Sequence, residues 1–192
     1  MTNKEVQPFI KKTTKNVIYK MSYITNQPVK QICGDLCLHS LADKRKLIEE
    51  LAPFVKWSIK IDDVVCSPAD KPIKDYPLSG NDLERVNVKI DINSFELVRG
   101  LAYSVGWSIA KVVAFCIERS MSDFDFLNQY ISEFIETSMD NNEKSIINKF
   151  ANKINESLDD ELSIPMLLID IVEEKPIDQN LTEAVQQVAI KW

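Results

Sequence analysis

The 192-residue chain has few of the residues that build catalytic and metal centres: one histidine, four cysteines and four glycines. Ser-His-Asp or Cys-His catalysis would have only His39 as its base. Cys33 and Cys37 lie four residues apart on a predicted helix, but His39 points elsewhere, and zinc needs three or four convergent ligands. The glycines are dispersed and form no phosphate-binding loop. We therefore expect buried core thiols, no enzyme, no metal and no cofactor.

Long apolar runs are also missing. The longest candidate, Ile164 to Val172, is interrupted by Asp170 and is shorter than the roughly 18 residues of a membrane span. The segment Met1 to Lys12 is polar and has no apolar core of a signal peptide. Four scattered cysteines are too few for a disulfide scaffold in a chain of this length. These absences predict a cytoplasmic chain that does not associate with membranes.

The net charge of −6 is unevenly distributed. Residues 1–60 contain 11 Lys and Arg against 5 Asp and Glu, whereas residues 122–192 contain 5 against 15. The first part of the chain can therefore present a basic face to phosphate groups, despite the acidic total. Two interpretations stay open for its basic residues, a solvated face or an auxiliary phosphate contact: Lys15, Lys20, Lys44, Arg45 and Lys46.

The pattern divides the chain into four segments, and we detect no internal repeat. Residues 1–66 form a basic α/β segment, with a short strand at Lys15–Ser22, a helix from Pro28 and a second helix capped by Asp43. Proline-rich residues 67–83 form a linker. Residues 84–121 form a strand and two helices, and the acidic residues 122–192 form amphipathic helices beginning near Phe124, Ile146, Ser163 and Leu181. The predicted class is mainly α with a short β ribbon, α+β overall.

The segment 84–121 opens with a strictly alternating strand. A strand points successive side chains to opposite faces, and it needs a hydrogen-bonding partner. No second strand follows at hairpin distance; Asp91 or Asn93 caps a helix that ends at Gly106, and Ser108 caps the next helix. The natural completion is a second copy of the chain. One strand face is apolar and the other polar: Val86, Val88 and Ile90 against Arg85, Asn87 and Lys89.

This stretch resembles the ribbon-helix-helix family of the Arc and MetJ repressors. The resemblance covers residues 85–121 and is carried by three segments: Arg85–Asp91, Leu101–Gly106 and Ser108–Val113. It implies a homodimer on double-stranded DNA, in which the polar strand face reads bases in the major groove. The residues that it assigns to base reading are Arg85, Asn87 and Lys89. Those that it assigns to a backbone phosphate are Ser108, Ile109 and Lys111.

The resemblance also implies a role. It predicts a transcriptional repressor or a DNA-site organiser in partition or transfer, of prokaryotic, phage or plasmid type and associated with the nucleoid. The acidic C-terminal helices would then supply either oligomerisation, joining dimers into higher oligomers, or a surface for a partner protein. The alternative is an acidic helical interaction protein, an inhibitor or adaptor that does not bind DNA. Net acidity favours the alternative, whereas a polar face of Arg85, Asn87 and Lys89 favours the DNA reader.

Overall fold

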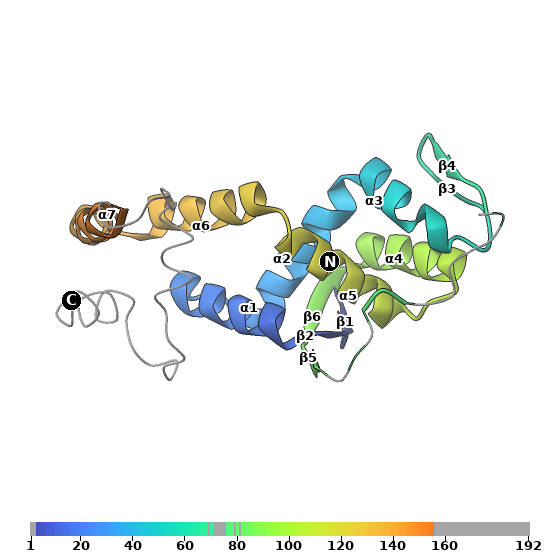
Figure 1. The fold of residues 1–192 in the computed structure, drawn as a ribbon, viewed down its shortest axis with the longest axis horizontal. Coiled ribbons are helices and arrows are strands. Elements are labelled where there is room, and N and C mark those ends of the chain that lie inside the picture. Colours follow the sequence, from blue (N-terminus) through green and yellow to red (C-terminus); the bar gives the residue numbers. More distant parts are fainter. Residues whose placement is uncertain (1–2, 69, 71–75, 79, 81, 156–192) are drawn as a thin grey trace. The chain divides into compact units, whose positions relative to one another are not determined.

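A computed structural model describes residues 3–68, 70, 76–78, 80 and 82–155 (Figure 1). The predicted class, mainly helical with short antiparallel pairs of strands, is confirmed. The described residues divide into two compact units, one within 3–15 and 28–122 and one within 16–27 and 123–155. The elements are β1 (Asn3–Val6), β2 (Phe9–Lys11), α1 (Lys12–Thr25), α2 (Val29–Ala42), α3 (Lys44–Leu51), the 3-10 turn η1 (Ala52–Phe54), β3 (Ile59–Ile61), β4 (Val64–Cys66), β5 (Leu83–Arg85), β6 (Val88–Asp91), α4 (Ile92–Val105), α5 (Ile109–Met121), α6 (Phe124–Ser138) and α7 (Asn141–Asn155).

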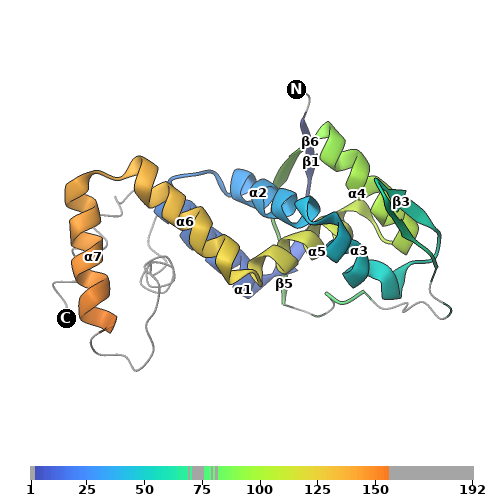
Figure 2. The ribbon, with the colours of Figure 1, turned by 90° about the horizontal axis from the view of Figure 1, so that it is seen from above.

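The alternating strand finds its partner within its own chain. β1 pairs antiparallel with β6 (Figures 1 and 2), and β2 pairs antiparallel with β5. Both pairings share one register, with Val6 opposite Val88 and Phe9 opposite Arg85. Residues 3–11 and 83–91 therefore form a single ribbon, interrupted around Pro8, whose carbonyl accepts the Val86 N–H at 3.1 Å. The expectation that this strand lacks a partner in its own chain is wrong. Its backbone groups therefore do not require a strand from a second chain.

The chain contains an internal repeat, so the expectation of none is wrong. Its offset is 80 residues, the difference between Lys12 and Ile92, which begin α1 and α4, two helices of equal length. The turns after these helices carry a positive φ at equivalent positions, 50° at Asn26 and 71° at Gly106. The repeat was hidden because its equivalent positions share apolar character rather than identity. Between residues 3–51 and 83–131 only six pairs are identical: Val6/Val86, Ile10/Ile90, Tyr23/Tyr103, Ser40/Ser120, Asp43/Asp123 and Leu47/Leu127.

The predicted strand at Lys15–Ser22 is also wrong, because these residues lie within α1. The alternation of Val17, Tyr19 and Met21 indicated a strand. A helical pattern overlaps it, however, and the side chains at its spacing of three and four residues are the buried ones. They are Thr14, Ile18, Met21, Ile24 and Thr25.

The inner face of the ribbon is covered within one chain. α2, α4 and α5 pack against it, and α2 and α5 also pack against each other. Ile10, Val88 and Ile90 are at most 1 % exposed. Between the two helices, the hydroxyl of Ser120 donates to the Leu36 carbonyl at 2.7 Å, which satisfies a buried polar group. The apolar face that appeared to require a partner chain is thus buried by the chain itself.

The segment between the two repeats is anchored on the end of α4. The N–H groups of Lys56 and Trp57 donate to the Ser104 carbonyl at 2.8 and 3.1 Å, and the Ser104 hydroxyl donates back to the Trp57 carbonyl at 2.7 Å. Within this segment, β3 and β4 pair as an antiparallel hairpin. The segment therefore contributes to the fold, rather than only connecting its halves.

The second unit contains the predicted helices α6 and α7. Leu127 and Ile131 are the buried side chains of α6, and the Tyr130 hydroxyl donates to the Gln27 side chain at 2.6 Å. The helices predicted to begin near Ser163 and Leu181 lie outside the described residues. Among the described residues no single helix is long and apolar enough to span a membrane; α4 and α5 pass that test only together, with a bend of 104° between them.

Candidate functional site

The three residues predicted to read bases lie where the alternation placed them. The side chains of Val86, Val88 and Ile90 point to the helices, so their neighbours lie on the opposite face of the ribbon. Arg85 and Asn87 are exposed and Lys89 is half-buried. Together with the equivalent residues of the N-terminal strand they form what we call the outer face: Glu5, Gln7, Phe9, Arg85, Asn87 and Lys89.

Sequence reasoning missed the half of the outer face that the N-terminal strand supplies. Glu5, Gln7 and Phe9 are all exposed, and Phe9 is 48 % exposed despite its apolar ring. The signal was present in the alternation of Val6, Pro8 and Ile10, which are all buried. It was obscured because a proline inside a strand argues against a strand, although proline is accepted where the ladder is interrupted.

Contacts across the ribbon order part of the outer face. The Arg85 guanidinium carbon lies 5.0 Å from the centroid of the Phe9 ring, a cation–π distance. Nη1 of Arg85 also donates to the Gln7 side-chain oxygen at 3.3 Å. These two contacts restrict the rotamers of Arg85, which lowers the entropy lost when the guanidinium binds a ligand.

Helix α2 packs closely against strand β6 at a glycine, Gly34. A Cβ on Gly34 would lie 2.5 Å from the carbonyl oxygen of Lys89. The backbone of α2 therefore approaches the backbone of β6 more closely than any side chain would allow. The position of Lys89 on the outer face depends on this close approach.

A carboxylate accepts hydrogen bonds at each of two junctions between a strand and a helix, β6–α4 and β2–α1. Asp91 caps α4, accepting the N–H groups of Asn93 and Ser94 at 2.9 and 3.1 Å and the Ser94 hydroxyl at 2.6 Å. These hydrogen bonds, chiefly those from Ser94, hold the pKa of Asp91 below its usual value. At the other junction, Glu118 of α5 accepts the Lys11 N–H at 2.7 Å and the Thr14 hydroxyl at 2.8 Å.

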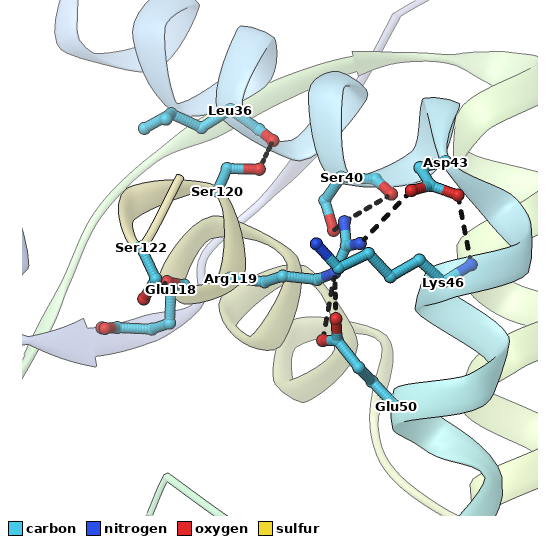
Figure 3. Close-up of polar contacts among 9 residues, drawn as sticks. All are labelled: Leu36, Ser40, Asp43, Lys46, Glu50, Glu118, Arg119, Ser120 and Ser122. Carbon is cyan, nitrogen blue, oxygen red and sulfur yellow. Dashed lines mark hydrogen bonds and ion pairs between the residues drawn. The ribbon is translucent and has the colours of Figure 1, made fainter. Parts of the chain in front are cut away.

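Arg119 ties α5 to α2, α3 and the Asp43 cap between them (Figure 3). Its Nε donates to both carboxylate oxygens of Glu50 at 3.0 Å, and its Nη1 donates to the carbonyl and hydroxyl of Ser40 at 3.3 and 3.4 Å. Nη2 lies 3.9 Å from the Asp43 carboxylate. Because the side chain of Arg119 is only 12 % exposed, these partners satisfy a charge that would otherwise be costly to bury.

The predicted phosphate site at the start of α5 is a capped helix N-terminus. The Ser108 hydroxyl accepts the Lys111 N–H at 3.3 Å, which confirms the predicted cap, while Ile109 is the first residue of the helix. The Tyr76 hydroxyl donates to the Lys111 carbonyl at 2.7 Å, and the Lys111 ammonium lies 5.0 Å from the Tyr76 ring. Burial raises the pKa of Tyr76 well above its ordinary value. Lys111 itself is exposed.

Aromatic side chains cover the flank of this helix start. The Trp107 ring lies 4.9 Å from the Phe54 ring and 4.8 Å from the Tyr76 ring, measured between centroids. The segment between the repeats therefore holds Trp107 against the fold beside Ser108. Apart from the Lys111 N–H, which the Ser108 cap accepts, the first turn of α5 keeps the N–H groups that a helix N-terminus directs outward.

Two of the five auxiliary basic residues form ion pairs within the fold. Lys15 lies 2.6 Å from Glu84, and Lys44 lies 2.5 Å from Asp62. The hydrogen bond from Lys15 lowers the pKa of Glu84. These contacts favour a structural role for Lys15 and Lys44. The remaining three are exposed or half-buried: Lys20, which lies in the second unit, and Arg45 and Lys46 on α3.

The cysteines are buried free thiols, as the sequence predicted. Burial raises the pKa of Cys33 to about 12, so this thiol stays protonated and unreactive at neutral pH. A hydrogen bond with Cys116 also raises the pKa of Cys37. Within the part of the chain that the structure describes, no group of three or more His, Cys, Asp and Glu side chains is arranged to hold a metal ion.

No protein-family model, curated protein or solved structure matches the chain. Its function is therefore inferred from the outer face of the ribbon and from the start of α5.

Proposed function

We propose that this protein binds double-stranded DNA with sequence preference, by inserting the outer face of its ribbon into the major groove. The observation that carries the proposal is an antiparallel ribbon, packed on helices on one side and presenting exposed polar side chains on the other. A major groove about 12 Å wide admits a two-stranded ribbon. In this proposal the chain is a single-chain form of the ribbon-helix-helix module.

The outer face offers the donors and acceptors that base edges require. Arg85 and Lys89 match the O6 and N7 acceptors of guanine, while Asn87 and Gln7 match the N6 donor and N7 acceptor of adenine. Arg85 is held over Phe9, so less side-chain entropy is lost when it binds. Base contacts of this kind supply sequence preference, whereas charge attraction to phosphates does not.

The start of α5 supplies a phosphate contact. The first N–H groups of a helix and its dipole attract an anion, and the exposed Lys111 adds a positive charge. Ser108 and Ile109 lie at this helix start. Phosphate contacts hold the protein in register on the duplex, so they strengthen binding to every sequence.

The role of such a protein follows from occupancy of a DNA site. It would act as a transcriptional repressor, or as an organiser of a DNA site in partition or transfer, in a prokaryote, phage or plasmid. The acidic residues from 122 onward would bind further chains or a partner protein, because their charge is unsuited to contact DNA. Glu5 on the outer face and the net charge of −6 favour one alternative, an acidic interaction protein that does not bind DNA.

The test combines selection with titration. The full chain selects duplexes from a random library, and its affinity is measured on the selected and a scrambled duplex across a salt series. Asn87→Ala removes no charge and should weaken binding to the selected duplex by about 1–3 kcal/mol while leaving the scrambled duplex unaffected. Lys111→Ala should weaken binding to both duplexes and reduce the salt slope by about one unit.

Matched variants control for composition and charge. Asn148→Ala changes an exposed asparagine of α7, and Lys60→Ala changes an exposed lysine of β3, so both should bind like the wild type. If selection enriches no sequence, or if Asn87→Ala behaves like Asn148→Ala while the fold is intact, the ribbon does not read DNA. The interaction-protein alternative would then be favoured.

A further inference from the structure

We propose that a single chain reads an asymmetric DNA sequence, because the two strands of its ribbon present different side chains to the groove. This inference rests on the proposed function and specifies the class of DNA that the outer face recognises. A symmetric homodimer presents the same residues twice and so recognises a sequence with two-fold symmetry. This chain carries both strands itself and has no such constraint.

The two strands are related by the 80-residue offset. In the ribbon register, Glu5 faces Lys89 and Phe9 faces Arg85, which places Gln7 opposite Asn87 at the centre. Gln7 and Asn87 are also 80 residues apart, so the repeat and the register share one centre. The two strands of the ribbon are thus arranged like those of a symmetric dimer, but within one chain.

The two strands of the ribbon occupy equivalent backbone positions about this centre, but their side chains differ. Glu5 occupies the position of Arg85, and Phe9 occupies the position of Lys89. One end of the outer face therefore carries Arg85 with Phe9, and the other carries Lys89 with Glu5. Only the central pair, Gln7 and Asn87, is chemically alike.

Each end suits different base pairs. Arg85 matches guanine, and Phe9 provides an apolar surface for a thymine methyl group. At the other end, Lys89 matches guanine while Glu5 accepts a hydrogen bond from the cytosine amino group. The centre favours adenine. Residues 5–9 extend about 13 Å at roughly 3.3 Å per residue, which corresponds to about four base steps of 3.4 Å.

The N-terminal ends of α2 and α5, which occupy equivalent positions in the two repeats, also differ. α5 begins with a Ser108 hydroxyl cap and carries Lys111, whereas α2 follows Pro28, which provides no side-chain cap. The α2 residue equivalent to Lys111 is the neutral Gln31, and the exposed lysine of that helix start, Lys30, lies one position earlier, where α5 has Ala110. The phosphate contacts at the two helix starts are therefore unequal, which gives the bound chain a preferred orientation on the duplex.

The first experiment measures stoichiometry and symmetry on a short duplex that contains one selected site. Titration at concentrations well above Kd should saturate at one chain per duplex. Two further duplexes each repeat one half of the site as a palindrome. Both should bind the wild-type chain about tenfold more weakly or worse, because each places mismatched bases under one strand.

The second experiment makes the outer face symmetric. The triple variant Glu5→Arg, Gln7→Asn, Phe9→Lys gives both strands the same readers. It should lose affinity for the selected site and gain affinity for the palindrome built from the half that the Arg85 strand reads. Circular dichroism and thermal melting verify its fold. If it does not fold, the affinities of the wild-type chain for the two palindromes decide between asymmetric and symmetric reading.

The outcomes separate the two proposals. A palindromic selected site, or saturation at two chains per site, overturns asymmetric reading and leaves DNA binding by the ribbon intact. Enrichment of no sequence overturns both. A one-to-one complex on an asymmetric site, with both palindromes weakened, supports both.

Discussion

Replacing Gly34 by alanine should destabilise the protein, although alanine is the better helix former. Gly34 lies inside α2, where the exchange gains about 1 kcal/mol of helix propensity. The new Cβ would lie 2.5 Å from the Lys89 carbonyl oxygen, and backbone at that distance must move. Overpacking of a core typically costs about 1–3 kcal/mol, so the net loss is about 0–2 kcal/mol.

Gly100→Ala is the matched control. Gly100 also lies within a helix, α4, but its Cβ would meet the Ile59 side chain at 3.6 Å, an ordinary contact. This variant should gain about 0.5–1 kcal/mol of stability. The difference between the two variants isolates the overpacking at Gly34, about 1–3 kcal/mol.

Urea unfolding followed by tryptophan fluorescence measures this difference, with unchanged m-values as the check on two-state behaviour. In thermal melts each kcal/mol corresponds to about 2–4 °C for a chain of this size. Because the displaced atom belongs to the ribbon, Gly34→Ala should also weaken DNA binding, whereas Gly100→Ala should not. Equal stability of the two alanine variants would refute the close packing of α2 on the ribbon.

Three further substitutions test the ends of helices. Asn26→Gly should stabilise the protein by up to about 1 kcal/mol, because φ is 50° there and glycine adopts that region freely. Gly106→Ala should destabilise it, since φ is 71° and the new Cβ would meet Lys56 Nζ at 2.8 Å; opposite shifts in melting temperature are the expected result. Asp91→Ala should remove the cap of α4 and about 1 kcal/mol at neutral pH. The pKa of Asp91 is lowered in the fold, so its contribution is complete above the ordinary value near 3.9 and is lost as pH falls through the lowered one. Urea midpoints of wild type and variant should therefore converge as the pH falls below that lowered pKa, and a constant gap would contradict the role of the carboxylate.

The local signals of the sequence were sufficient for most of the second repeat. Asp91, Gly106 and Ser108 mark helix ends because capping depends on a few neighbouring residues. The alternation over residues 85–90 placed the outer face correctly, since strand geometry alone sends neighbouring side chains to opposite sides. The mainly helical class followed from the same periodicities.

The sequence by itself thus determined which residues of the second strand face outward, that Asp91 or Asn93 begins the first helix, and that Gly106 and Ser108 end it and begin the next, because those properties are local. Only the tertiary structure decided what pairs with that strand. The partner lies about 80 residues earlier in the chain, includes Pro8 and shares few identities with the strand it mirrors. Long-range pairing depends on how several helices bury one ribbon face together, and no local pattern encodes that. The same packing supplied Glu5, Gln7 and Phe9, and so made the outer face asymmetric.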